Sequence, residues 1–148
     1  MKAKDFLTKG QLTYLASCIG ESEHQTSGEI RIHIDTKCPG DARERAIKTF
    51  HLIGMRKTAA RNGVLIYVAC ESRKFAVIGD KGINEVVPRG FWKNICDDLS
   101  DKFSTGSYVE GLETAVRRIG EKLKTYFPYD ENDVNELPDD VSLDENDQ

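Results

Sequence analysis

The sequence lacks any long run of apolar residues. None of its uninterrupted apolar stretches approaches the ~20 residues that a helix needs to cross a bilayer. Residues 1–7 begin with a positive charge, but they contain no apolar core and no small-residue cleavage site, so they do not resemble a secretory signal. We therefore expect a cytoplasmic protein that does not associate with a membrane.

Paired cysteines and ligand-spaced histidines are also missing. The four cysteines lie far apart without a C-x-x-C pair, and the three histidines show no metal-ligand spacing. We expect reduced thiols with structural or incidental roles, and histidines at the surface. Cys38, which stands beside Pro39 and Gly40, is expected to be exposed and able to oxidise.

Several signatures of catalysis and binding are absent as well. The sequence contains no G-x-x-x-x-G-K-[ST] phosphate loop, no G-x-S-x-G elbow and no EF-hand pattern. Scattered histidines give no basis for a Ser–His–Asp triad. Basic residues do not cluster with exposed aromatic residues, which is the pattern typical of nucleic-acid binding, so we expect no nucleic-acid partner.

The composition is that of one folded domain, with 148 residues, 39% hydrophobic and 31% charged. The charge is unevenly distributed. Residues 128–148 hold nine acidic residues and no basic one, so residues 1–127 hold all 21 basic residues against 16 acidic ones, a net charge of +5. We predict a folded domain over 1–127 and a flexible acidic tail over 128–148. The tail either docks on the basic body or on an unknown protein partner, or stays solvated; a monomer is favoured.

Apolar periodicity predicts an α/β fold. Residues 28–35 alternate between apolar and polar, as in a half-buried strand, whereas 63–69 are apolar on both faces, as in a central strand. A short link joins the central strand to a third strand at 74–80, which predicts a hairpin. A helix between the first two strands implies a parallel pair with a right-handed crossover. We predict a three-layer α/β/α sandwich around a short mixed sheet, with the central strand between the other two. Its helices carry apolar stripes at Leu12, Leu15 and Ile19; Ala46, Phe50 and Ile53; Trp92, Ile95, Leu99 and Phe103; and Val109, Leu112, Val116, Ile119 and Leu123.

This topology brings polar residues to one edge of the sheet. The third strand runs back along the central one, so its end at Asp80 lies beside Asn62 at the start of the central strand. Carboxylate and amide oxygens are the ligands that Ca²⁺ and Mg²⁺ prefer. Asp80 and Glu85 are close enough in sequence to share one ion. The alternative is that Asp80 caps the following turn and Glu85 is solvated.

Three basic residues, Arg56, Lys57 and Arg61, precede the same edge. A phosphate could be held between them and a bound cation, as phosphoryl chemistry requires. The alternative is a basic surface loop, which could also serve as the docking site of the tail.

Taken together, several segments resemble the TPM domain family in order and spacing over about residues 1–127. They are Ser27-Gly28-Glu29-Ile30, Phe50 to Thr58, Arg61 to Ala69, Arg73 to Asp80 and Phe103-x-x-Gly106-x-Tyr108-x-x-Gly111-Leu112. The resemblance implies a Rossmann-like sandwich and a divalent cation, usually calcium, near the edge described above. It implies Asp80, Glu85 and Asn62 as the metal ligands. Longer relatives carry a further acidic residue in that loop, where this chain reads Pro88-Arg89-Gly90.

The leading hypothesis is therefore a calcium-binding module, with Mg²⁺ as the other candidate cation. Because some relatives are described as acid phosphatases, a metal-dependent phosphoester hydrolase is the first alternative, with Arg61, Arg56 and Lys57 as phosphate ligands. A protein-interaction module that uses the acidic tail is the second. Whether the chain is an enzyme is left open at this stage.

Overall fold

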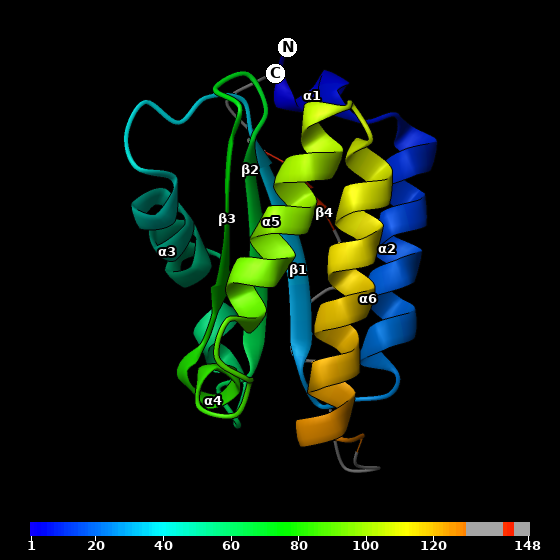
Figure 1. The fold of residues 1–148 in the computed structure, drawn as a ribbon, viewed down its shortest axis with the longest axis vertical. Helices are drawn as coiled ribbons and strands as arrows, with labels where there is room; N and C mark the ends of the chain where they lie inside the picture. Colours follow the sequence, from blue (N-terminus) through cyan, green and yellow to red (C-terminus); the bar gives the residue numbers. More distant parts are fainter. Residues whose placement is uncertain (130–140, 144–148) are drawn as a thin grey trace.

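A four-stranded mixed sheet forms the centre of the molecule (Figure 1). The structure is a computed structural model that describes residues 1–129 and 141–143. The strand order is β3-β2-β1-β4, in which β1 and β2 are parallel, β2 and β3 form an antiparallel hairpin, and β4 is parallel to β1. The predicted central position of the second strand is confirmed. The strands are β1 (Glu29–Asp35), β2 (Gly63–Ala69), β3 (Lys74–Gly79) and β4 (Val141–Leu143).

Helices cover both faces of this sheet, which confirms the three-layer sandwich (Figure 1). On one face lie α2 (Lys9–Glu23), α5 (Phe91–Ser104) and α6 (Tyr108–Tyr126). On the other face lies α3 (Ala42–Leu52), the crossover helix between the parallel strands, followed by the short helix η1 (Met55–Lys57). Two four-residue helices, α1 (Ala3–Phe6) and α4 (Lys81–Asn84), lie at opposite ends of the sheet (Figure 1). Among the described residues, no helix combines the length and apolar character needed to cross a membrane.

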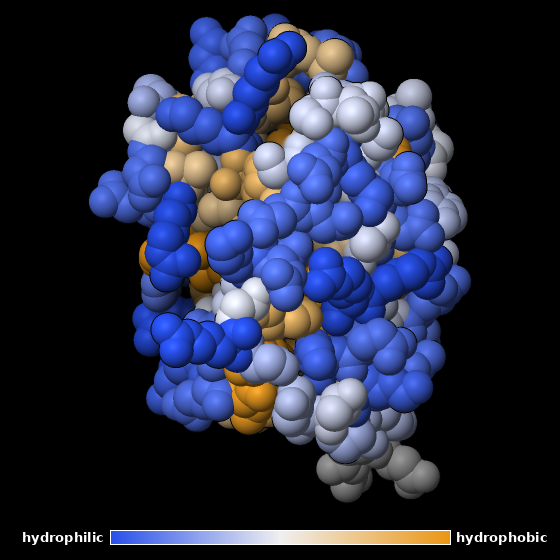
Figure 2. Space-filling view, in the orientation of Figure 1, coloured by the Kyte–Doolittle hydropathy of each residue, from blue (hydrophilic) through white to orange (hydrophobic). Residues whose placement is uncertain are grey.

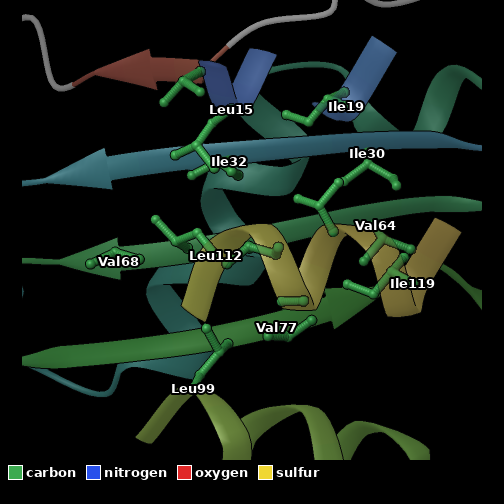
Figure 3. Packing of buried hydrophobic residues seen from close by; sticks show 14 of the residues in the cluster. Leu15, Ile19, Ile30, Ile32, Val64, Val68, Val77, Leu99, Leu112 and Ile119 are labelled. Carbon is green, nitrogen blue, oxygen red and sulfur yellow. The ribbon is translucent and has the colours of Figure 1, made fainter. Parts of the chain in front are cut away.

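The larger core lies under α2, α5 and α6. Ile30 and Ile32 of β1 pack there with the apolar stripes of these helices (Figure 3). Each fully buried aliphatic side chain stabilises the fold by roughly 1.5–3 kcal/mol relative to exposure. A smaller core lies under α3, where Phe50 and Met55 contact Leu65 and Tyr67 of β2. β2 is therefore buried on both faces, as its continuous apolar sequence predicts.

Two predictions about exposure near β1 are wrong. The alternating pattern predicts solvated polar residues on the second face, yet Glu29 and Asp35, at the two ends of the strand, are 4% and 1% exposed. Cys38, predicted to be exposed, is 2% exposed because the chain after β1 turns into the smaller core. The ammonium of Lys74 fixes this turn by donating to the Cys38 carbonyl at 3.0 Å and to the Gly40 carbonyl at 2.8 Å.

The strand β4 comes from the segment predicted to be a tail, where the sequence predicts no strand. Its residues Val141, Ser142 and Leu143 pair with the middle of β1. Val141 is buried and joins the larger core. The other tail residues, 130–140 and 144–148, lie outside the described residues.

Candidate functional site

Asp80 and Arg61 form an ion pair at the sheet edge where the sequence predicts a cation site. Asp80 follows β3, is 8% exposed, and accepts two hydrogen bonds from the Arg61 guanidinium, at 2.6 Å from Nε and 2.8 Å from Nη2. This bidentate geometry is the strongest form of Arg–carboxylate pair. The hydrogen bond to Asp80 raises the pKa of Arg61. Asp80 also caps α4, because its Oδ1 accepts from the backbone N–H of Lys81 at 2.8 Å. The capping alternative is thus present in the structure.

Backbone contacts hold these two segments together. The Asp80 N–H donates to the Gly63 carbonyl at 2.9 Å, and the Gly82 N–H donates to the Arg61 carbonyl at 2.8 Å. Gly82 approaches so closely that a Cβ atom there would lie 2.0 Å from the carbonyl oxygen of Ala60. Only glycine fits this contact without moving backbone atoms. The edge is therefore built by the paired segments 60–63 and 79–82.

Asn62 is the third element of the edge, and it is fully buried at 0% exposure. Its backbone N–H donates to Thr58 Oγ1 at 3.1 Å, and its Nδ2 donates to Ser27 Oγ at 3.2 Å. Within residues 1–129 and 141–143, its Oδ1 meets no hydrogen-bond partner. A buried amide oxygen without a donor costs roughly 1–3 kcal/mol, so such an atom calls for an explanation, such as a bound ion or water.

The third predicted ligand, Glu85, and its neighbour Asn84 lie on α4. Glu85 is the exposed C-cap residue of α4, and its backbone N–H donates to the Lys81 carbonyl at 3.1 Å. Asn84 is occupied, since its Nδ2 donates to the Gly79 carbonyl and its Oδ1 accepts from Trp92 Nε1, both at 2.8 Å. Across residues 1–129 and 141–143, no three His, Cys, Asp or Glu side chains form a group that could hold a metal.

The predicted phosphate ligands do not meet at one point. The Arg61 side chain is engaged with Asp80. The Arg56 guanidinium lies 3.4 Å from His51 Nδ1, near the end of α3. Lys57 closes η1 at the surface, next to Gly54.

A second polar cluster, which the sequence did not reveal, lies at the opposite end of the sheet. Asp35 accepts from the Tyr67 hydroxyl at 2.6 Å, is bonded to His33 Nε2 at 2.8 Å and accepts from Arg45 Nε at 3.3 Å. The other ring nitrogen of His33 lies 2.7 Å from Ser142 Oγ on β4. The signal available in sequence was the register of parallel strands, which places His33 beside Tyr67.

The surroundings of Asp35 favour the ionised form of its carboxyl. Burial, the largest single effect, would raise the pKa of the Asp35 carboxyl, but the hydrogen bonds from His33 and Tyr67 and the charges of His33 and Arg45 together outweigh it, so the pKa lies below its usual value. Burial, and after it the hydrogen bond to Asp35, raises the pKa of the Tyr67 phenol well above its ordinary range. The tyrosine therefore stays a neutral donor to a charged carboxylate.

Comparison with known proteins agrees with this architecture. The family model described as the TPM domain matches residues 1–122. The chain is 38% identical to the BA42 protein of the psychrophilic bacterium Bizionia argentinensis, whose NMR structure superposes with a TM-score of 0.87 over 97% of this chain and 99% of BA42. The N-terminal domain of cg2496 from Corynebacterium glutamicum shares the fold at 11% identity, with a TM-score of 0.62 over 79% of this chain and 74% of that domain.

The fold and the family match define a TPM-type α/β/α domain. This chain belongs to the TPM domain family. No curated protein matches the chain.

Proposed function

We propose that this chain is a divalent-cation-binding TPM domain whose site lies at the start of β2 and the end of β3. The observation that carries the proposal is the fully buried Oδ1 of Asn62, which no donor in the described part of the chain reaches. A hard cation such as Ca²⁺ takes neutral amide oxygens together with carboxylates. Asp80 is the nearby carboxylate in this proposal, since its backbone is paired with that of Gly63, the residue after Asn62.

In this proposal, the Arg61 guanidinium is the positive charge that pairs with the Asp80 carboxylate when no metal is bound. Its guanidinium meets both carboxylate oxygens, and the side chain is 28% exposed, so it can turn toward solvent. A divalent ion would then replace one positive charge with two at the same carboxylate. Glu85, exposed one turn of α4 away, would supply a further oxygen.

The test is a titration with Ca²⁺ followed by amide NMR, with Mg²⁺ in parallel to measure selectivity. We expect shifts centred on residues 61–63 and 79–85. In Asp80→Asn these shifts should be lost. In Arg61→Gln the affinity for Ca²⁺ should rise severalfold, because the competing charge is gone while the carboxylate remains. Asp98→Asn is the matched control, since Asp98 pairs with Lys102 on α5, and it should bind like the wild type.

Equal affinities in the wild type and Arg61→Gln would remove Asp80 from the ligand set. A complete lack of shifts at millimolar Ca²⁺ would mean that this member does not bind cations at the edge. Phosphoester hydrolysis stays a prediction without a supporting contact, since Arg61 is engaged with Asp80 and Arg56 lies by His51.

A further inference from the structure

A cavity of about 300 Å³ opens at the end of the sheet opposite the proposed cation site. It lies between the end of the β2–β3 hairpin, the last turn of α5 and the start of α6. Figure 2 shows apolar surface exposed in a recess between polar rims on this side of the molecule. Small-molecule sites in proteins begin at about this volume, and in α/β folds they favour the carboxyl ends of parallel strands, where β2 ends here.

Four aromatic side chains line the cavity. Phe6, Tyr108, Phe103 and Phe75 form a continuous series, with ring-centroid distances of 4.7, 5.4 and 5.6 Å between neighbours. All four rings are half-buried rather than fully packed. Rings tilted against one another leave faces and edges available to a further planar ring. The lining therefore selects a flat, apolar group.

The rim of the cavity supplies one available cation. Arg73 lies on it and is exposed, and no hydrogen bond or ion pair of its guanidinium occurs within the described part of the chain. Its backbone has a positive φ of 54°, an uncommon conformation for a residue with a side chain. Lys74 also lines the cavity, but its ammonium is bound to the Cys38 and Gly40 carbonyls, so it contributes only its aliphatic stem. An Arg fork matches a carboxylate in shape as well as charge.

We propose that this cavity binds a small aromatic carboxylate, with one or two fused rings against the aromatic wall and its carboxylate on Arg73. The proposal is independent of the cation site, because the two sites lie at opposite ends of β2 and share no residue.

The test is an amide NMR titration without added metal, using 2-naphthoate, its neutral analogue 2-naphthamide and the non-aromatic anion octanoate. We expect 2-naphthoate to shift residues 68–75 and 100–108 and to bind more tightly than the other two compounds. Arg73→Gln should weaken 2-naphthoate about fivefold, which is the worth of one exposed ion pair, and leave 2-naphthamide within about twofold. Arg43→Gln, at an exposed arginine on α3, should change neither affinity.

A second variant tests the cavity itself and leaves the charge of Arg73 unchanged. Ser104 is exposed at the rim on the last turn of α5, so Ser104→Phe should fill the opening without disturbing the core, and it should abolish binding of both naphthyl compounds. The proposal is overturned if 2-naphthoate shifts residues elsewhere or none at all. It is equally overturned if Arg73→Gln weakens the acid and the amide alike, or if Ser104→Phe binds as the wild type does.

Discussion

Two buried aspartates lie at opposite ends of the sheet, and the protein satisfies them differently. Asp35, the last residue of β1, is bonded to side chains from three elements: His33 of β1, Tyr67 of β2 and Arg45 of α3. Asp80, after β3, accepts from a single side chain within the described residues, Arg61, and from the backbone of the helix that it caps.

This difference indicates a structural role for the Asp35 carboxylate and leaves the Asp80 carboxylate available to a ligand. If Arg45 moved away, Asp35 would still be paired with the Tyr67 hydroxyl and with His33 Nε2. If Arg61 moved away, the Asp80 side chain would keep, among the described residues, only the backbone bond that caps α4, next to the Asn62 oxygen that has no donor among these residues. Asp35 thus stabilises the fold at one end of the sheet. At the other end, Asp80 pairs with Arg61, which a cation would displace in the proposed function.

The comparison predicts its largest effect on stability for Asp35→Asn. The variant keeps the shape of the side chain but removes the charge that Tyr67, His33 and Arg45 share, and we expect a loss of about 2–3 kcal/mol in the free energy of unfolding at pH 7. Urea denaturation measures this loss. Asp80→Asn should cost less, and Asp98→Asn, at a partly exposed helix pair, no more than about 0.5 kcal/mol. Equal losses at Asp35 and Asp80 would remove the distinction between the two ends.

The same carboxylate predicts the dependence of stability on pH. Its folded-state pKa lies below that of an unfolded aspartate, about 3.9, so the ionised form stabilises the fold above that pH. This contribution disappears as the pH falls through the folded-state pKa. Unfolding measured from pH 7 down to pH 3 should therefore show a steeper acid loss in the wild type than in Asp35→Asn. Parallel curves would contradict the assignment.

The parts of the fold that follow local patterns were predictable, and the parts that need distant partners were not. The apolar run at 63–69 identifies the buried central strand, and topology places Asp80 beside Asn62. Sequence alone could not show that Arg61 and Asp80 neutralise each other, because this requires the positive φ of 53° at Arg61 and the close approach of Gly82. The strand β4 was missed because three residues in an acidic segment give no recognisable period, and their partners on β1 lie 109 residues away.

The end of the sheet that carries the proposed cation site depends on one close backbone contact, which Gly82→Ala should break. The added Cβ would lie 2.0 Å from the Ala60 carbonyl oxygen and 2.7 Å from that of Arg61, and neither backbone atom can rotate away. We expect a loss of about 2 kcal/mol, with amide shifts confined to residues 60–63 and 79–85. Gly10→Ala is the matched control: Gly10 lies in α2 with its nearest contact 4.0 Å away, so the variant should gain about 0.5–1 kcal/mol. An unchanged stability in Gly82→Ala would show that the edge can separate at little cost.

The smallest effect is expected at the link between the Asp35 end and β4. Ser142 Oγ lies 2.7 Å from His33 Nδ1 at a half-buried position, so Ser142→Ala should cost about 0.5–1 kcal/mol. His33→Ala removes the bond to Asp35 as well, so the contribution of Ser142 is isolated by a double-mutant cycle of the two variants. We expect a coupling energy of about 0.5 kcal/mol or more, together with faster amide exchange at residues 32–34 in Ser142→Ala. A coupling energy near zero with unchanged exchange would mean that the buried Val141, rather than this bond, holds β4 against β1.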